Sequence, residues 1–294
     1  MEHKIDLHFH SKYSEGAFTV DELLTQAKKF GFTVLSLTDH NVIEGVPEIL
    51  AKAPNYGIKA ISGVELYTKY QNIGFHLLGY NFDHTNKKLV EVMHELQTDN
   101  ENKIKKSINN LKAEGFIIDE HRIFNLPAKN YGAVHILEEM EKEEKNVERI
   151  KKDLPTQHDD FFVKIEKYFG NDKPGQFTLS ELPTDEAIKL IELAGGFSSL
   201  AHPGQQISFK YDNIIVNLKQ HGLRAIEVLS PYHNWHQIEH YQEIALTYKL
   251  LITGGSDFHG DIDFSKNELL SRQWNYFHVP YNIYEELKNK IPNL

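Results

Sequence analysis

The sequence predicts an α/β protein whose parallel strands close into a barrel. Seven apolar segments alternate with segments of helical periodicity, the order expected of a parallel sheet covered by helices. The strands are apolar along most of their length and are bounded by polar residues, which favours a closed barrel over an open two-sided sheet. The length of 294 residues allows one barrel-sized domain or a domain with an insertion.

The first half of the barrel is expected before residue 83. Its strands are predicted at residues 4–10, 33–40, 58–66 and 73–80. A polar loop, residues 11–16, follows the first strand. The next helix is predicted over 19–30, where apolar residues recur at helical spacing and Gly31 can end the helix.

The strand signal fades from residue 83 to 181, where the chain is charged and has helical periodicity. We expect this segment to be a helical insertion that caps the active-site mouth of a barrel domain formed by residues 1–82 and 182–294. The remaining strands are expected within 195–203, 223–229 and 250–259. Helices are predicted over 184–194 and 235–248.

Composition narrows the range of partners. The formal net charge of -10 argues against binding to duplex nucleic acid or to an anionic membrane surface. The chain has no cysteine, which excludes disulfides and thiolate metal sites. The first residues lack the pattern of a signal peptide and no apolar run could span a bilayer, so we expect a cytoplasmic enzyme. The sequence does not indicate the oligomeric state.

The strongest functional pattern begins with two histidines in the first strand. Alternate residues of a strand share a face, so His8 and His10 point to the same side. Further imidazoles and carboxylates stand at or just after other strand ends: Glu15, His40, Glu65, His76, His202, Asp257 and His259. The C-terminal ends of parallel barrel strands meet at one mouth, so we expect these nine side chains to form a metal site.

The donor types indicate which metals fit. All nine donors are nitrogen or oxygen, which suits Zn²⁺, Mn²⁺ or Fe²⁺ and disfavours copper(I) or iron-sulfur clusters. Nine ligands exceed the needs of one ion. With three protein ligands to each ion and one bridging carboxylate, they suffice for two or three divalent metal ions.

Several motifs together resemble the polymerase and histidinol phosphatase (PHP) family of phosphoesterases. They are Asp-Leu-His-x-His-Ser from residue 6, Leu-Thr-Asp-His-Asn from 37, Gly-Val-Glu from 63, His-Leu-Leu-Gly-Tyr from 76, Leu-Ala-His-Pro from 200 and Gly-Gly-Ser-Asp-Phe-His-Gly from 254. The resemblance implies a distorted (β/α)7 barrel that holds three metals. By this resemblance His8, His10, Glu65 and Asp257 would hold the first metal. Glu65 would bridge to a second metal held by His76 and His202, and Glu15, His40 and His259 would hold the third.

Within that family, the insertion and the run from residue 226 to 233 are similar to a branch that acts on small nucleotides. That branch dephosphorylates nucleoside 3',5'-bisphosphates and 5'-monophosphates or trims short 5'-phosphorylated RNA. Two departures stand out. Glu15 replaces a usual aspartate, and Gly132-Ala133-Val134-His135 replaces a usual Arg-Pro-His, so the arginine expected to bind phosphate is missing.

We therefore expect a metal-dependent phosphoesterase in which a metal-bridging hydroxide attacks the phosphorus. The metals must neutralise most of the substrate charge, because the chain has only four arginines. Asp39 and Asp6 are candidates to orient a ligand imidazole, with an exposed or barrel-floor carboxylate as the alternative for Asp39. His233 is expected to touch the phosphate or protonate the leaving group, unless it faces solvent, and His135 is a second candidate for substrate binding.

Other interpretations of the same residues stay open. A histidinol-phosphate phosphatase, or another small-molecule phosphatase, would use the same metal chemistry. An amidohydrolase barrel also begins with His-x-His but typically carries a lysine where this chain has His76. A non-catalytic domain of a polymerase tends to lose its metal ligands. Tyr232 and Trp235 could stack a base, although packing or capping is the preferred interpretation.

Overall fold

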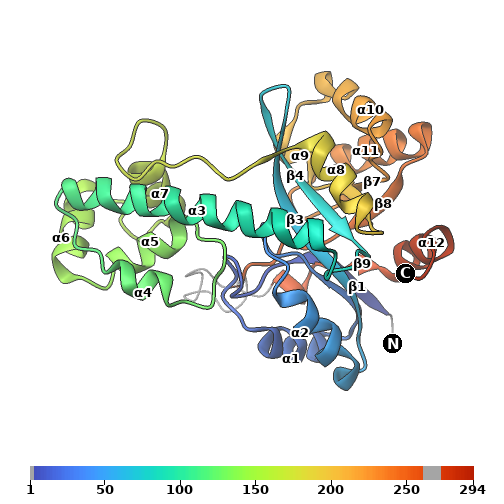
Figure 1. The fold of residues 1–294 in the computed structure, drawn as a ribbon, viewed down its shortest axis with the longest axis horizontal. Coiled ribbons are helices and arrows are strands. Elements are labelled where there is room, and N and C mark those ends of the chain that lie inside the picture. Colours follow the sequence, from blue (N-terminus) through green and yellow to red (C-terminus); the bar gives the residue numbers. More distant parts are fainter. Residues whose placement is uncertain (1–2, 261–272) are drawn as a thin grey trace. The chain divides into compact units, whose positions relative to one another are not determined.

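The computed structural model describes residues 3–260 and 273–294 of the chain. The chain divides into two compact units. Unit 1 comprises Met1–His94 and Glu181–Leu294, and unit 2 comprises Glu95–Ser180 (Figure 1). Each unit has a hydrophobic core of its own.

Unit 1 is built on one curved sheet. Its main strands are β1 (Lys4–Phe9), β2 (Phe32–Leu37), β3 (Lys59–Tyr70), β4 (Ile73–Tyr80), β6 (Phe197–Leu200), β7 (Ala225–Leu229) and β8 (Leu251–Gly254). They follow the order β8-β7-β6-β4-β3-β2-β1. The two-residue strand β9 (Val279–Pro280) pairs with β1 along the edge that does not pair with β2. Another two-residue strand, β5 (Leu182–Pro183), pairs with β3. The seven predicted strands are present, whereas β5 and β9 were not predicted.

The two ends of the sheet approach each other and nearly close a barrel. The segment just after β8 runs beside the end of β1, where the Asp257 amide donates to the His8 carbonyl at 2.7 Å. The His10 amide donates to the Phe258 carbonyl at 2.9 Å. The distorted (β/α)7 barrel expected from the sequence is confirmed, and three of the four residues that form its seam, His8, His10 and Asp257, are predicted metal ligands.

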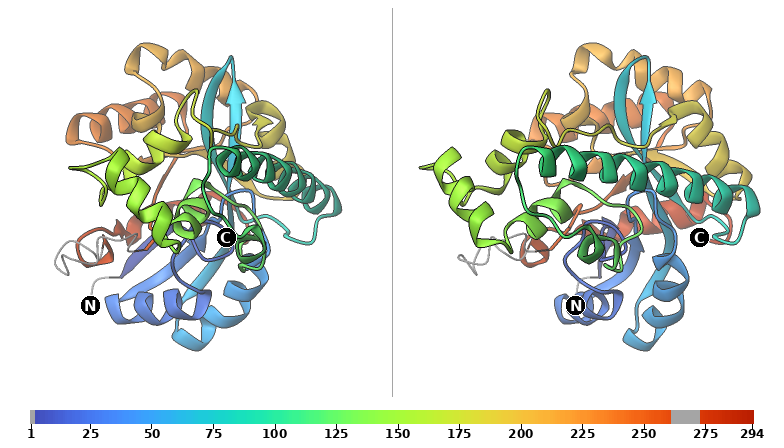
Figure 2. Two further views of the ribbon diagram at one scale, coloured as in Figure 1. Left: turned by 90° about the vertical axis from the view of Figure 1, so that its left-hand side faces the viewer. Right: turned by 60° about the vertical axis from the view of Figure 1, so that its left-hand side comes forward.

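One strand runs against the prediction of an all-parallel sheet. β4 is antiparallel to both β3 and β6, while β1, β2, β3, β6, β7 and β8 share one direction. β3 extends to Tyr70, so only Gln71 and Asn72 remain as a link, and both have positive φ. A parallel connection needs a crossover of a dozen or more residues, so a two-residue link requires a hairpin. The hairpin is the cyan pair that stands out in both views of Figure 2.

Helices pack around the sheet of unit 1 (Figure 1). They are α1 (Val20–Phe30), α2 (Gly45–Lys52), α8 (Thr184–Leu193), α9 (Pro203–Gln206), α10 (Asn213–Gln220), α11 (Trp235–Tyr248) and α12 (Tyr281–Lys290), with 3-10 turns η1 (Ala53–Tyr56), η2 (Phe209–Tyr211) and η4 (Gln273–Asn275). In the view of Figure 1, α1 and α2 lie below the strands and α8 to α11 lie above them. The helices predicted over 19–30, 184–194 and 235–248 agree with α1, α8 and α11 to within one residue, because local sequence signals set their ends. For example, Thr19 and Glu22 form a capping box before α1, and Gly31 ends that helix with φ 82°.

Unit 2 is helical, as expected for the insertion. The long helix α3 (Lys87–Ala113) begins in unit 1 and is followed by α4 (Glu120–Phe124), α5 (Ala133–Met140), α6 (Glu144–Asp153) and α7 (Phe161–Phe169). Ile104, Ile108 and Leu111 of α3 lie in the core of unit 2. The predicted role of this unit as a cap over the active-site mouth stays a prediction.

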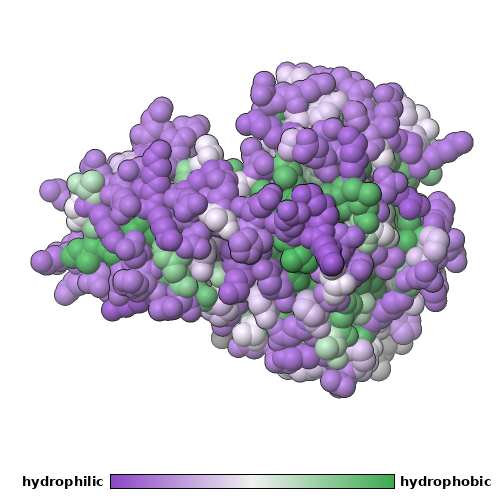
Figure 3. All heavy atoms as spheres, viewed as in Figure 1, coloured by the Kyte–Doolittle hydropathy of each residue, from purple (hydrophilic) through white to green (hydrophobic). Residues whose placement is uncertain are grey.

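The face drawn in Figure 3 is mostly hydrophilic, with hydrophobic residues in separate patches. Within residues 3–260 and 273–294, no helix has both the length and the apolar character needed to cross a membrane. The expected cytoplasmic location stays a prediction.

Gly63 of β3 offers a test of the sheet packing. A Cβ at this position would lie 2.2 Å from the Ser36 hydroxyl and 2.6 Å from the Leu37 carbonyl of β2. We expect Gly63→Ala to lower the free energy of unfolding by about 1–3 kcal/mol in urea denaturation, because overpacking forces the strands apart. Gly74→Ala is the control, since its nearest neighbour would be Glu181 at 3.6 Å. An equal loss in both variants would contradict the packing argument.

Candidate metal centre

Strand β1 brings the first two predicted ligands into a buried site. Asp6, His8 and His10 share one face of the strand, and all three are fully buried. Leu7 and Phe9 point the other way, into hydrophobic cores. The two imidazoles lie close to one carboxylate, with Nε2 of His8 at 3.1 Å and Nε2 of His10 at 3.3 Å from Oε2 of Glu65. The alternation expected from the sequence therefore sets both rings on the same side.

Glu65 is the centre of the cluster. This fully buried carboxylate lies in the middle of β3 and has five imidazoles within 3.3 Å. Besides the β1 pair, they are His40 Nδ1 at 3.0 Å from Oε2, His76 Nδ1 at 2.9 Å from Oε1 and His202 Nε2 at 3.3 Å from Oε1. Burial alone would raise the pKa of Glu65, but these imidazoles hold it well below its usual range.

The segment after β8 supplies Asp257 and His259. Oδ1 of Asp257 lies 2.9 Å from Nε2 of His10 and 3.2 Å from Nε2 of His8. The His259 ring stacks on the His10 ring at 4.0 Å between centroids. Burial would raise the pKa of Asp257, but the imidazoles of His8 and His259 lower it well below its usual value.

The reversed direction of β4 explains how His76 joins this group. His76 lies opposite Tyr67 in the hairpin and near the start of β4. Because β4 runs against its neighbours, its first half faces the same mouth as the second half of β3. The prediction that His76 follows the C-terminal end of a parallel strand was wrong, although the side chain reaches the site.

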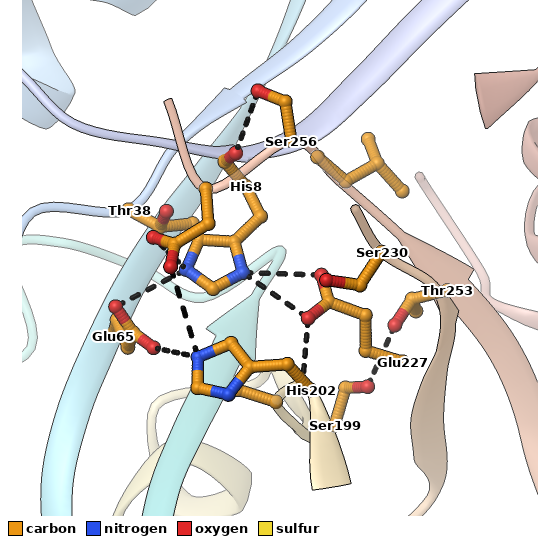
Figure 4. Close-up of polar contacts among 12 residues, drawn as sticks. His8, Thr38, Glu65, Ser199, His202, Glu227, Ser230, Thr253 and Ser256 are labelled. Atoms are coloured by element: carbon orange, nitrogen blue, oxygen red, sulfur yellow. Dashed lines mark hydrogen bonds and ion pairs between the residues drawn. The ribbon is translucent and has the colours of Figure 1, made fainter. Parts of the chain in front are cut away.

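Glu227 of β7 was not predicted and contacts two ligand residues (Figure 4). Its carboxylate accepts from Nδ1 of His8 at 3.1 Å and from the backbone amide of His202 at 2.8 Å. It is fully buried. A carboxylate that fixes the second ring nitrogen is a common partner of a metal-binding histidine. The one signal in the sequence was a glutamate inside an otherwise apolar strand.

Gln206, at the end of α9, was also not predicted. Its Oε1 accepts from the His76 amide at 2.6 Å, and its Nε2 donates to the Ala201 carbonyl and lies 3.1 Å from Nδ1 of His202. The side chain therefore links β4 to the segment that carries His202. Nothing in the sequence pattern distinguishes this glutamine from a surface residue.

The two aspartates predicted to orient imidazoles bind other groups instead. Asp6 accepts from the His8 amide at 3.1 Å, from the Ser256 amide at 2.9 Å and from Nε1 of Trp274 at 2.7 Å. Burial raises the pKa of Asp6 to about 6. Asp6 thus holds the barrel seam together, and the prediction that it contacts a ring was wrong.

Asp39 holds the loop after β1. Its carboxylate accepts from the Ser11 amide at 2.8 Å, the Ser11 hydroxyl at 2.7 Å and the Ser14 hydroxyl at 2.6 Å. This loop carries Glu15. Glu15 is partly buried and forms no hydrogen bond or ion pair within 4 Å with any residue that the structure describes. Burial, partly offset by the charge of His10, raises the pKa of Glu15 to about 7. The catalytic role of Asp39 and the metal-binding role of Glu15 stay predictions.

His233 and His135 are both buried and bonded within the protein. Nδ1 of His233 donates to the Val228 carbonyl at 2.8 Å, and Nε2 accepts from the Gly204 amide at 3.0 Å. Both ring nitrogens are therefore used, and burial lowers the pKa of His233. His135 belongs to unit 2, where its Nδ1 accepts from the Gly132 amide at 3.0 Å. Their predicted roles toward the substrate stay predictions.

The cluster fits divalent metal ions. Among the described residues, three sets have ligand atoms within 4.8 Å of one another: His8 with His10, Glu65 and Asp257; His40 with Glu65 and His76; and His10 with His40 and His259. Nε2 of His8, Nδ1 of His40 and Oε2 of Glu65 are buried and have no hydrogen-bond partner among those residues. Buried polar atoms are rarely left unpaired, and a cation would satisfy all three.

The protonation preferences of the rings differ within the cluster. Burial alone would lower the pKa of His8, but the carboxylates of Glu65, Glu227 and Asp257 raise it well above its ordinary value. Burial lowers the pKa of His40 well below its ordinary value. The carboxylates of Glu65, Glu227 and Asp257 thus favour positive charge beside the His8 ring, and a bound cation would supply such charge.

The order of these motifs along the chain can now be compared with known proteins. Residues 6–173 match the PHP domain, which is more than half of the chain. The chain belongs to the PHP domain family. The match begins with β1 and includes the ligand residues up to His76.

Relatives of this PHP domain protein match it over nearly their whole length. It is 28% identical to a 5'-3' exoribonuclease of Haemophilus influenzae, over 91% of this chain and 95% of the relative. It is 26% identical to a 3',5'-nucleoside bisphosphate phosphatase of Chromobacterium violaceum, over 87% of each chain. A solved structure from Bifidobacterium adolescentis, described as a metal-dependent phosphoesterase, has the same fold with a TM-score of 0.79 at 21% identity, covering 100% of this chain and 98% of that one. The predicted family and enzyme class, a metal-dependent phosphoesterase, are confirmed.

The contact between Glu227 and His8 gives a testable role to a residue outside the predicted set. Glu227→Gln keeps the shape but leaves one acceptor oxygen for two donors. We expect metal affinity, measured by titration with Mn²⁺ or Zn²⁺, to fall by about 10–100-fold. Glu181→Gln, which alters a surface ion pair with Lys69, is the control and should bind metal as the wild type does. Unchanged affinity in Glu227→Gln would show that Glu227 does not support the site.

Proposed function

We propose that this PHP domain protein hydrolyses phosphate esters of small nucleotides with two or three divalent metal ions bound at the Glu65 cluster. The observation that carries the proposal is the overlap of three ligand sets around one mouth of the barrel, with Glu65, His10 and His40 each belonging to two of them. A carboxylate such as Glu65 can bind one ion through each of its two oxygens, whereas each imidazole binds one ion, so the overlapping sets suit ions that lie close together.

The proposed ligands follow from these sets. His8, His10, Glu65 and Asp257 would hold one ion, and Glu65, His76 and His202 a second. His40 and His259, together with Glu15, would hold a third. Bound divalent ions lower the pKa of water to near neutrality and neutralise the charge of a phosphate ester. The nitrogen and oxygen donors support Zn²⁺, Mn²⁺ or Fe²⁺.

The chain's other residues prepare the site. Glu227 fixes the orientation of the His8 ring, and Asp39 fixes the loop that brings Glu15 to the mouth. The Tyr67 ring stacks on His40 at 4.5 Å and meets His76 edge-on at 5.0 Å, which keeps water from that side of both rings. We propose that Asp39 and His233 support catalysis by positioning other groups. Asp39 positions the loop of Ser11 and Ser14, and His233 positions the backbone at Gly204.

Two observations support a small nucleotide as substrate. The full-length relatives are a nucleoside bisphosphate phosphatase and a 5'-3' exoribonuclease, so both act on nucleotides or their polymers. The net charge of -10 supports free nucleotides or short single strands over duplex nucleic acid. A cytoplasmic location, where such compounds occur, belongs to the same proposal.

Removal of the metals provides the first test. We expect chelation to abolish phosphate release and re-addition of Mn²⁺ to restore it. The midpoint of thermal unfolding should fall on chelation, because a ligand that binds only the folded state stabilises it. Asp257→Ala should reduce kcat/KM by at least about 100-fold, more than loss of a supporting contact. Full activity in the chelated protein would refute metal dependence.

The substrate is tested by phosphate release from the manganese-loaded protein on a panel. The panel contains adenosine 3',5'-bisphosphate, AMP, a short 5'-phosphorylated RNA, histidinol phosphate and p-nitrophenyl phosphate. We expect kcat/KM to be highest on one of the three nucleotide substrates. Turnover of histidinol phosphate with none of the nucleotides would overturn the nucleotide assignment and leave the metal chemistry standing.

A further inference from the structure

Tyr232 extends from the metal ligands to the surface of unit 1. Burial of its hydroxyl end, the charge of Asp257 and a hydrogen bond to Asp257 raise the pKa of Tyr232 above its ordinary value. The ring meets the His202 ring edge-on, with 5.7 Å between centroids. Yet 43% of the residue is exposed. The side chain therefore lies beside two predicted ligands, Asp257 and His202, while much of the residue is open to solvent.

The loop that carries Tyr232 is held firmly. His233, the next residue, is bonded through both ring nitrogens, to the Val228 carbonyl and to the Gly204 amide. Nε2 of Gln237 in α11 donates to the Gly204 carbonyl at 2.8 Å. These bonds connect the loop after β7 to α9, the short helix after β6, and hold the rim of the mouth on this side in place. A ring on a rim held in place loses little conformational freedom when it binds a ligand.

The exposure of this rim differs from the sequence prediction. Packing or capping was the preferred interpretation of Tyr232 and Trp235, but Trp235 is 67% exposed at the start of α11. A tyrosine that contacts the site on one side and is exposed to solvent on the other can stack against a flat apolar group. Aromatic side chains bind the bases of nucleotides in this way, without preference for sequence.

We infer that Tyr232 is the platform on which the nucleobase of the substrate stacks while the phosphate lies at the Glu65 cluster. The inference rests on the proposed function and adds to it the position of the base and the residue that selects for it. It also separates nucleotides from sugar phosphates, which have no flat ring to stack.

Two variants separate the ring from the hydroxyl. Tyr232→Phe keeps the ring and removes the hydrogen bond to Asp257, whereas Tyr232→Leu removes both. Tyr248→Leu is the matched control, because Tyr248 is 38% exposed and is the last residue of α11, the helix that follows the Tyr232 loop. Metal content is measured for each protein so that loss of metal is not mistaken for loss of stacking.

The first measurement is the affinity for adenosine by calorimetry, which does not depend on turnover. We expect the Kd to rise about tenfold or more in Tyr232→Leu and to change little in Tyr232→Phe and Tyr248→Leu, in keeping with the usual effect of one stacked base. The second is the ratio of kcat/KM for AMP to that for ribose 5-phosphate, a matched pair that differs only in the base. This ratio should fall about tenfold in Tyr232→Leu relative to Tyr232→Phe.

The outcomes distinguish this inference from the proposed function. Equal adenosine affinity in the wild type and Tyr232→Leu, or no measurable binding by the wild type, would overturn the inference that Tyr232 binds the base. The proposed function would survive that result if AMP were still hydrolysed. If the metal-loaded wild type released phosphate from no ester, the proposed function would fail, and the adenosine titration would still decide whether Tyr232 binds the base.

Discussion

A single buried carboxylate organises this protein. Glu65 has no access to water, and five imidazoles from four different strand regions surround it. An isolated carboxylate in such a place would be strongly destabilising, so the arrangement requires partners of positive charge. The imidazoles provide part of that charge, and their own unpaired atoms leave room for metal ions to provide the rest. Much of the surrounding structure, including the Glu227 contact and the β3–β4 hairpin, fixes the positions of these rings.

The ligand positions could be predicted because they depend on local rules. The alternation of a strand placed His8 and His10 on one face, and the meeting of strand ends at a barrel mouth grouped the others. Of the nine predicted ligands, the structure brings seven into overlapping sets and leaves His202 beside Glu65. Glu15 has no bonded partner among residues 3–260 and 273–294. Glu15 differs because it lies on a loop, whose path depends on the Asp39 contacts rather than on strand periodicity.

The contacts that the sequence did not reveal join residues that lie far apart along the chain. Glu227 meets a residue 219 positions away, and Asp6 meets Ser256 and Trp274 at the other end of the chain. No local pattern records such a pairing, because it depends on the register of strands that come together only in the folded barrel. The direction of β4 was missed for a simpler reason. The predicted third strand ended four residues early, which hid the two-residue link that requires a hairpin.

The position of the barrel seam has a consequence for how the protein folds. The hydrogen bonds that close the sheet join His8 and His10 to Asp257 and Phe258, and His10 and Asp257 are 247 positions apart. Contacts of such long range form late in folding, because the chain must first pay the entropy of bringing its ends together. A chain in which the seam is still open lacks Asp257 and His259 beside His8 and His10, so the closed barrel and the complete cluster of ligands form together.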